Sequence, residues 1–120
     1  MLEADIVAPN ILRFRNGVTR EFPAPIATLR EIEGITVVLL QWIQWGADPV
    51  VGWTHGNNLV AFDAQGKCVW TVHSRQGVAR PLLLTGFMDD EDGLRLHEAH
   101  GWWVRVDARS GCVVASDWIG

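Results

Sequence analysis

The chain contains one segment twice, VAFDAQGKCV at residues 60–69 and VRVDARSGCV at residues 104–113, and the two copies align without a gap. Each copy is an alternating apolar and polar stretch, a turn that opens with Asp-Ala and closes with Gly, and a second alternating stretch. Alternation with a period of two predicts a half-buried β-strand, and two such strands around a short turn predict a β-hairpin. The repeat therefore predicts hairpins near residues 58–73 and 102–118.

The two predicted turns differ in length. Asp63-Ala64-Gln65-Gly66 suits a type I turn that is closed by a glycine in the left-handed region of backbone space. The second copy has one more residue between its aspartate and Gly111. We therefore expect the same strand register to be reached through two different loops.

Other hairpins are predicted on both sides of the repeat. Asn-Gly at residues 16–17 lies between two strand-like stretches and is the strongest short hairpin signal. Pro23 and Pro25 then interrupt the pattern because proline has no N–H to donate, so residues 26–33 are predicted as a short helical turn or an irregular crossing. Residues 35–40 are apolar on both faces, which predicts a central strand.

Further strands are predicted at residues 82–87, 94–97 and 102–106, with a short one at 50–53. The sequence shows no amphipathic helix and no linker that would divide it, and 120 residues suffice for one domain. We expect an all-β single domain over residues 1–120. It should be an antiparallel meander of about nine strands, arranged as a twisted sheet, a sandwich or a partial barrel.

The net charge, the N-terminal residues and the longest apolar run limit the kinds of partner and the location that we expect. The formal net charge is −4 and the pI is about 5.4, whereas a general nucleic-acid binder needs a basic stripe. The first residues lack the basic and apolar regions of a secretory signal. The longest apolar run, residues 35–45, is about half of what a membrane-spanning helix requires. We expect a cytoplasmic protein that binds neither nucleic acid nor a membrane.

Cysteine usage fits that expectation. In a reducing compartment Cys68 and Cys112 are predicted to be small buried thiols at equivalent points of the two repeated hairpins. A disulfide between them is the alternative if the compartment is oxidising.

No pattern in the sequence predicts a catalytic, metal or cofactor site. His97 and His100 lie where a strand meets a turn and lack the helical spacing of a zinc-binding pair. The acids at residues 89–92 lack the alternating spacing of a calcium loop. The sequence contains no nucleophile elbow and no phosphate-binding loop. We therefore expect a protein that is not an enzyme and needs no cofactor.

The sequence does contain candidates for contact with a protein partner. Four adjacent carboxylates repel one another and add nothing to folding, which suggests a use outside the fold. Trp42, Trp45 and Trp53, near the glycine-rich loop at residues 46–58, are predicted either to pack in the core or, if exposed, to be interface anchors. Trp70, Trp103 and Trp118 are predicted in or beside the core. The predicted partner-binding set is Asp89, Asp90, Glu91, Asp92, Glu98, Trp45 and Trp53.

Two resemblances accompany these patterns. The repeat is similar to a propeller blade of the quinoprotein type, whose tryptophan matches Trp70, although a ring needs at least four blades. Nearly the whole chain resembles a group of small bacterial β-sheet proteins, some of which are similar to immunity proteins encoded beside secreted toxins. The motifs that carry this likeness are Asn-Gly-Val at 16–18 with Phe-Pro at 22–23, the segment 58–70, and the segment 101–111.

Three functions remain open at this point. The first is a binding protein that neutralises a cognate toxin through an acidic surface that covers a basic cleft. The second is a structural or accessory β-module that associates with copies of itself. The third is a small ligand-binding protein or enzyme whose site the sequence does not reveal.

Overall fold

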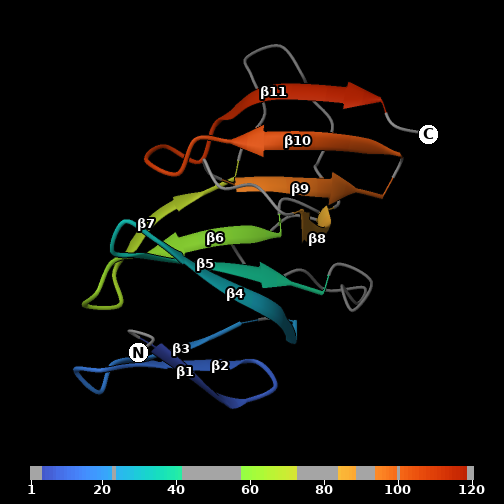
Figure 1. Ribbon diagram of the computed structural model, residues 1–120. Coiled ribbons are helices and arrows are strands. Elements are labelled where there is room, and N and C mark those ends of the chain that lie inside the picture. Colours follow the sequence, from blue (N-terminus) through green and yellow to red (C-terminus); the bar gives the residue numbers. More distant parts are fainter. Residues whose placement is uncertain are drawn as a thin grey trace.

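The chain folds entirely as β-structure in a computed structural model (Figure 1). The structure describes residues 4–22, 24–41, 58–72, 84–88, 94–99 and 101–118, with the backbone alone at 117–118. These residues form eleven strands: β1 (Ala4–Ala8), β2 (Ile11–Phe14), β3 (Thr19–Glu21), β4 (Ile26–Ile32), β5 (Ile35–Leu40), β6 (Leu59–Phe62), β7 (Cys68–Thr71), β8 (Leu84–Met88), β9 (Leu94–Glu98), β10 (Trp102–Val106) and β11 (Val113–Trp118).

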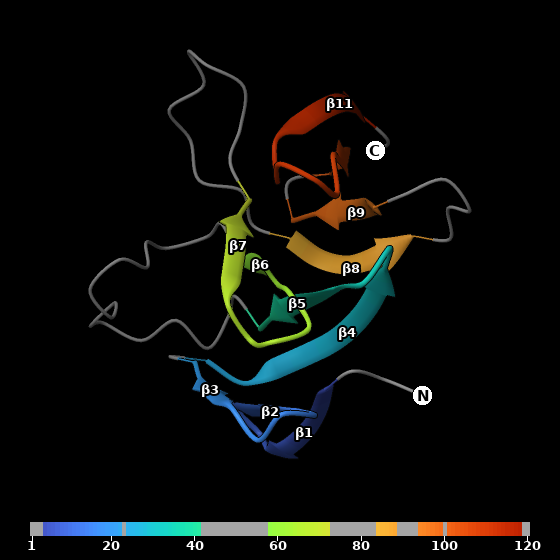
Figure 2. The ribbon, with the colours of Figure 1, turned by 90° about the vertical axis from the view of Figure 1, so that its left-hand side faces the viewer.

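The strands form three antiparallel sheets, in each of which neighbours in the chain are neighbours in the sheet. The N-terminal sheet has the order β1-β2-β3, the central sheet β4-β5-β6-β7, and the C-terminal sheet β11-β10-β9-β8. Figure 2 shows the central sheet lying between the other two. The predicted all-β meander is confirmed. Its arrangement is a stack of three open sheets and not a closed barrel.

The central sheet is apolar on both faces because both are covered. Along β5, Val37 and Leu39 pack in one cluster with residues of the C-terminal sheet, while Val38 and Leu40 pack in a second cluster with residues of the N-terminal sheet. β6 alternates in the same way. Successive side chains of a strand point to opposite faces, so a strand between two layers must be apolar throughout. The central strand predicted at residues 35–40 is confirmed.

Two of the predicted turns pack on aromatic side chains of the preceding sheet. A Cβ atom on Gly66 would lie 2.8 Å from Cδ2 of Phe14, and one on Gly111 would lie 2.5 Å from Cε3 of Trp70. Both glycines have positive φ, +85° and +75°. The predicted left-handed conformation is therefore confirmed at Gly66, and each turn uses glycine both for its backbone and for close approach.

One buried polar residue joins two sheets. Asn58, which directly precedes β6, is fully buried. Its Nδ2 donates to the carbonyl oxygens of Leu40 at 2.7 Å and Leu84 at 2.8 Å, and its Oδ1 accepts the N–H of Leu84 at 3.0 Å. Burial of an amide side chain is tolerated because its groups are paired. Asn58 thereby connects the end of β5 to the start of β8.

The structure corrects the strand count. About nine strands were predicted, and the two without a prediction are β1 and β4. Residues 26–32 are a strand of seven residues, so the predicted helical turn or irregular crossing is wrong. β4 pairs with β5 along its length, with a bulge between Ile26 and Thr28. Pairing with a strongly apolar neighbour outweighs the prolines before it and its own charged residues. The possible strand at 50–53 lies outside the described residues.

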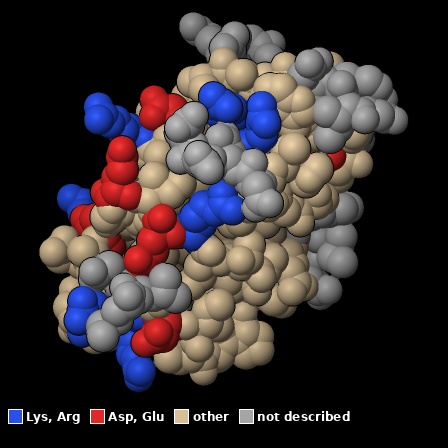
Figure 3. Space-filling model, viewed as in Figure 1, with Lys and Arg blue, Asp and Glu red and all other residues tan. Residues whose placement is uncertain are grey.

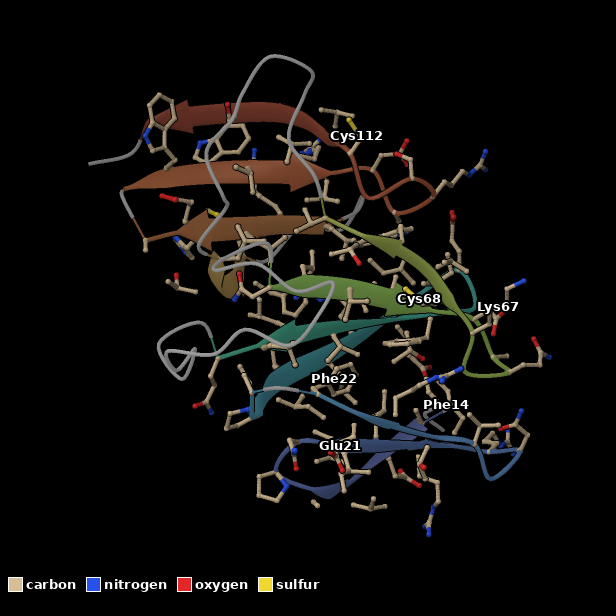
Figure 4. All side chains as sticks on the ribbon, turned by 180° about the vertical axis from the view of Figure 1, so that it is seen from behind. Phe14, Glu21, Phe22, Lys67, Cys68 and Cys112 are labelled. Carbon is tan, nitrogen blue, oxygen red and sulfur yellow. The ribbon has the colours of Figure 1, made fainter. Side chains whose placement is uncertain are left out.

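The prediction for the cysteines is also corrected. Cys68 is exposed and Cys112 half-buried, and both thiols are free. The carbonyl that accepts the aspartate N–H belongs to Lys67 in the first repeated hairpin and to Cys112 in the second. Because the second turn is one residue longer, Cys112 corresponds in space to Lys67 and not to Cys68. Figure 4 labels all three residues.

Candidate functional site: the turn end

Four strand connections gather at one end of the molecule, on the left of Figure 1. They are the turns at residues 14–18, 32–35, 63–67 and 107–112, which come from all three sheets. We call this surface the turn end. Loops at one end of a β-scaffold are a common location for binding surfaces, because a rigid framework holds them in place.

Hydrogen bonds between sheets hold three of these turns, those at 14–18, 63–67 and 107–112. Asn16 Nδ2 donates to the carbonyl of Gln65 at 3.0 Å, and Arg20 Nε donates to the carbonyl of Gly66 at 2.7 Å. Trp70 Nε1 donates to the carbonyl of Ala108 at 2.7 Å. The turn at 63–67 is thus tied to the N-terminal sheet, and the turn at 107–112 is tied to the central sheet.

Charged side chains are concentrated at the turn end. In Figure 3 most of the red and blue residues lie on its side of the molecule. Two of the acids there serve the turns themselves. Asp63 Oδ1 accepts the N–H groups of Gln65 and Lys67, each at 2.9 Å, and Asp107 Oδ1 accepts the N–H of Arg109 at 3.0 Å. These are the local contacts for which aspartate is favoured at turn starts.

Glu33 differs from Asp63 and Asp107, because its backbone has a strained conformation. Glu33 and Gly34 form the two-residue turn between β4 and β5, since Ile32 pairs with Ile35. Their φ values are +50° and +81°, so the turn is of the type that favours Asn-Gly or Gly-Gly. Glu33 is the only non-glycine with positive φ among the described residues. A residue other than glycine in the left-handed conformation loses about 1–2 kcal/mol of stability.

A hollow of about 360 Å³ opens beside this turn. Its apolar part includes Ile32 and Val114, and charged residues of both signs line it, Glu33 from the β4–β5 turn and Arg105, Asp107 and Arg109 from the β10–β11 hairpin. Glu33 and Arg109 are exposed. The side chains of these two residues have no hydrogen bond or ion pair with another described residue.

The acidic segment predicted to bind a partner lies outside the described residues, but the strands on both sides of it are described. Asp89, Asp90, Glu91 and Asp92 connect β8 to β9, and the last pair before the connection is Met88 with Arg95. The carbonyl of Met88 accepts a hydrogen bond of 3.4 Å from Arg30 Nη1 of β4, close to the β4–β5 turn. The described end of β8 therefore lies next to β4.

The other residues predicted to contact a partner are Glu98, Trp45 and Trp53. Glu98 is 6% exposed, so its side chain offers little surface to a partner. Trp45 and Trp53 lie outside the described residues. Of the tryptophans predicted near the core, Trp70 is buried in the cluster between the central and C-terminal sheets. Trp103 is half-buried, with the guanidinium of Arg95 4.4 Å from its ring centroid.

Sequence reasoning missed Glu33, Arg109 and the hollow. The only local signal was the Glu-Gly pair at residues 33–34, in a place where Asn-Gly is the usual sequence. Within the described ranges no cluster of three or more His, Cys, Asp or Glu side chains is arranged to hold a metal ion. The same ranges contain no helix long and apolar enough to cross a bilayer.

Comparison of the chain with protein-family models, with curated proteins and with solved structures found no match.

Proposed function

We propose that this chain is a non-enzymatic binding protein, and that its partner is a cognate toxin whose basic cleft it covers with the turn end. The acidic residues 89–92, which connect β8 to β9 in the sequence, would provide the main charge contact, and the turn end would provide further contacts. Complementary charge of this kind increases the rate of association and rejects unsuitable partners. The formal net charge of −4 is in keeping with a basic partner.

The observation that supports the proposal is the turn end, where turns from three sheets form one ordered surface. The turn at 63–67 is hydrogen-bonded to the N-terminal sheet, and the turn at 107–112 is hydrogen-bonded to the central sheet. A surface that is already ordered loses little conformational entropy when a partner binds. A small β-protein with such a surface is suited to rapid and tight capture of another protein.

A second candidate is a β-module that associates with its own copies. Ile6 and Val7 of the edge strand β1 are 48% and 46% exposed. Edge strands with apolar side chains are potential pairing sites. The bulge between Ile6 and Ala8 interrupts the regular ladder there, which opposes continuous pairing with a second chain. For this reason we favour the toxin-binding proposal.

Co-expression tests the proposal directly. The gene next to this one should encode a toxin, and co-expression of the chain should restore growth to cells that produce that toxin. The purified pair should form a complex whose association slows as salt concentration rises. Glu21 lies exposed on β3, away from the turn end (Figure 4), so Glu21→Lys is the control and should protect as well as the native chain. Absence of protection with a well-expressed, folded chain contradicts the proposal.

A further inference from the structure

We propose that the hollow at the turn end is a binding site for a segment of the protein partner that carries a basic and an acidic group on a short apolar stem, with Glu33 receiving the cation and Arg109 the anion. This inference rests on the proposed function for the identity of the occupant as part of a protein. The chemistry of the site follows from the residues that line the hollow.

The hollow has a charged residue of each sign from two different sheets. Glu33 comes from the central sheet and Arg109 from the C-terminal sheet, and the hollow between them has apolar lining from Ile32 and Val114. Val114 is 40% exposed, so the hollow offers apolar surface that a ligand stem would remove from water. A ligand with a single charge would pair with one of the two residues and leave the other unused. A ligand with both charges uses both.

The backbone of Glu33 is strained, with φ +50°. The chain uses Asn-Gly in its β2–β3 hairpin, where Gly17 alone has positive φ, but it places glutamate at a positive-φ position of the β4–β5 turn. The carboxylate of Glu33 has no hydrogen bond or ion pair within the described part of the chain that would compensate for this strain. Strained residues that persist are concentrated at functional sites. A recognition role for the carboxylate accounts for its presence there.

Asp107 and Arg105 do not fill the same role. The Asp107 carboxylate already accepts the N–H of Arg109, which holds the turn in shape. Arg105 is half-buried and has an interaction of its own, whereas Arg109 is exposed on the loop. Among the described residues that line the hollow, Glu33 and Arg109 are therefore the charged pair whose side chains have no other described partner.

The test uses 6-aminohexanoate, which carries an ammonium and a carboxylate at the two ends of an apolar stem. Titration into ¹⁵N-labelled protein should shift the amide signals of Glu33, Gly34 and residues 107–109 at millimolar concentrations. Hexylamine and hexanoate at equal ionic strength should bind more weakly. The variants Glu33→Gln and Arg109→Gln should each weaken 6-aminohexanoate binding roughly two- to fivefold, as expected for partly exposed ion pairs. Glu21→Gln is the control and should have no effect.

A second variant separates recognition from folding. Glu33→Gly removes the backbone strain together with the carboxylate. It should raise the melting temperature and at the same time weaken binding of 6-aminohexanoate. The inference is overturned if the signals of these residues do not shift, if the singly charged compounds shift them equally, or if Glu33→Gln and Glu33→Gly bind as the native chain does.

The two proposals fail in different ways. If the titration is negative while the chain still protects cells against the toxin, the hollow is not the site and the proposed function stands. If the titration is positive and the chain protects against no neighbouring toxin, the hollow binds such groups but the proposed function is wrong.

Discussion

Gly111 lies against the indole ring of Trp70, so close that a Cβ atom on Gly111 would be 2.6 Å from Cδ2 and 2.9 Å from Cγ. The Trp70 ring also donates its N–H to the carbonyl of Ala108 in the same turn. The last hairpin of the chain is therefore seated on a side chain of the central sheet by both packing and a hydrogen bond. This contact requires both the absent side chain at residue 111 and the indole at residue 70.

Replacement of Gly111 by alanine should destabilise the protein by roughly 2–5 kcal/mol. About 1–2 kcal/mol comes from the positive φ, and the rest from forcing a methyl group against the indole ring. Gly17→Ala is the matched control, because Gly17 has φ +91° but nothing within 4 Å of the added Cβ. Gly17→Ala should therefore lower the free energy of unfolding only by the part that comes from the positive φ, about 1–2 kcal/mol. Urea unfolding curves of both variants measure the difference, and equal losses would show that the Trp70 contact adds nothing.

Asn58→Leu should lower the free energy of unfolding by roughly 2–4 kcal/mol. The change leaves two buried carbonyls and one buried N–H without the partners that Asn58 provides. Asn10→Ala serves for comparison, because Asn10 Nδ2 makes one bond, to the carbonyl of Phe22, in a partly buried position. We expect a loss of about 1 kcal/mol there. A small effect at Asn58 would mean that the two sheets are held together by apolar packing alone.

Thr36→Val should stabilise the protein by about 1 kcal/mol. The Thr36 side chain is buried in β5, and its hydroxyl oxygen has no hydrogen-bond partner. Valine has the same shape without the buried polar group, so the cost of its desolvation is removed. Thr36→Ser, which keeps the hydroxyl and loses the methyl group, should instead be destabilising. Thermal and urea unfolding would decide, and a less stable valine variant would indicate a partner for the hydroxyl.

Charge reversal in the acidic connection tests the toxin interface. Asp89→Lys and Asp90→Lys should slow association with the toxin and reduce its salt dependence, while the melting temperature changes little. The affinity should fall by roughly 1–3 kcal/mol if the acids are desolvated in the complex, and by a few tenths if they lie at its rim. Stopped-flow binding gives both rates. Unchanged rates would remove these residues from the interface and make Trp45 and Trp53 the next positions to test.

The exposed thiol of Cys68 should react with iodoacetamide before the half-buried thiol of Cys112. Because both thiols are free, a reducing agent should leave the melting temperature unchanged. Mass spectrometry of the alkylated chain identifies the faster site. Faster labelling at Cys112, or a lower melting temperature on reduction, would contradict the assignment.

Local patterns predicted the parts of the fold that local chemistry determines. The Asn-Gly pair at residues 16–17, the doubly apolar run at 35–40 and the two glycine turns all have the predicted structure. The strand at residues 26–32 has no such pattern, since charged and apolar residues mix along it and prolines precede it. Its structure depends on pairing with β5, which an isolated segment does not show.

The candidate site could not be predicted from the sequence, because it too depends on how separate segments pack. Glu33 and Arg109 are far apart in the sequence and come together only because two sheets stack. The alignment of the two repeats also misled the reading of Cys68, because one extra turn residue shifts the second strand by one position and reverses which residues point inward. Side-chain direction in β-structure depends on register, and register is fixed by turns and by neighbouring sheets.

The doubly covered central sheet has a consequence for how the protein is made. Residues 35–62 leave the ribosome long before the last hairpin exists, so the face that Val37, Leu39 and Leu59 present to the C-terminal sheet has no cover at that stage. Nascent chains with such a surface are prone to aggregation. A premature stop codon after β7 would therefore produce an insoluble fragment and not a smaller functional protein. The central sheet therefore depends on the C-terminal sheet to cover one of its apolar faces.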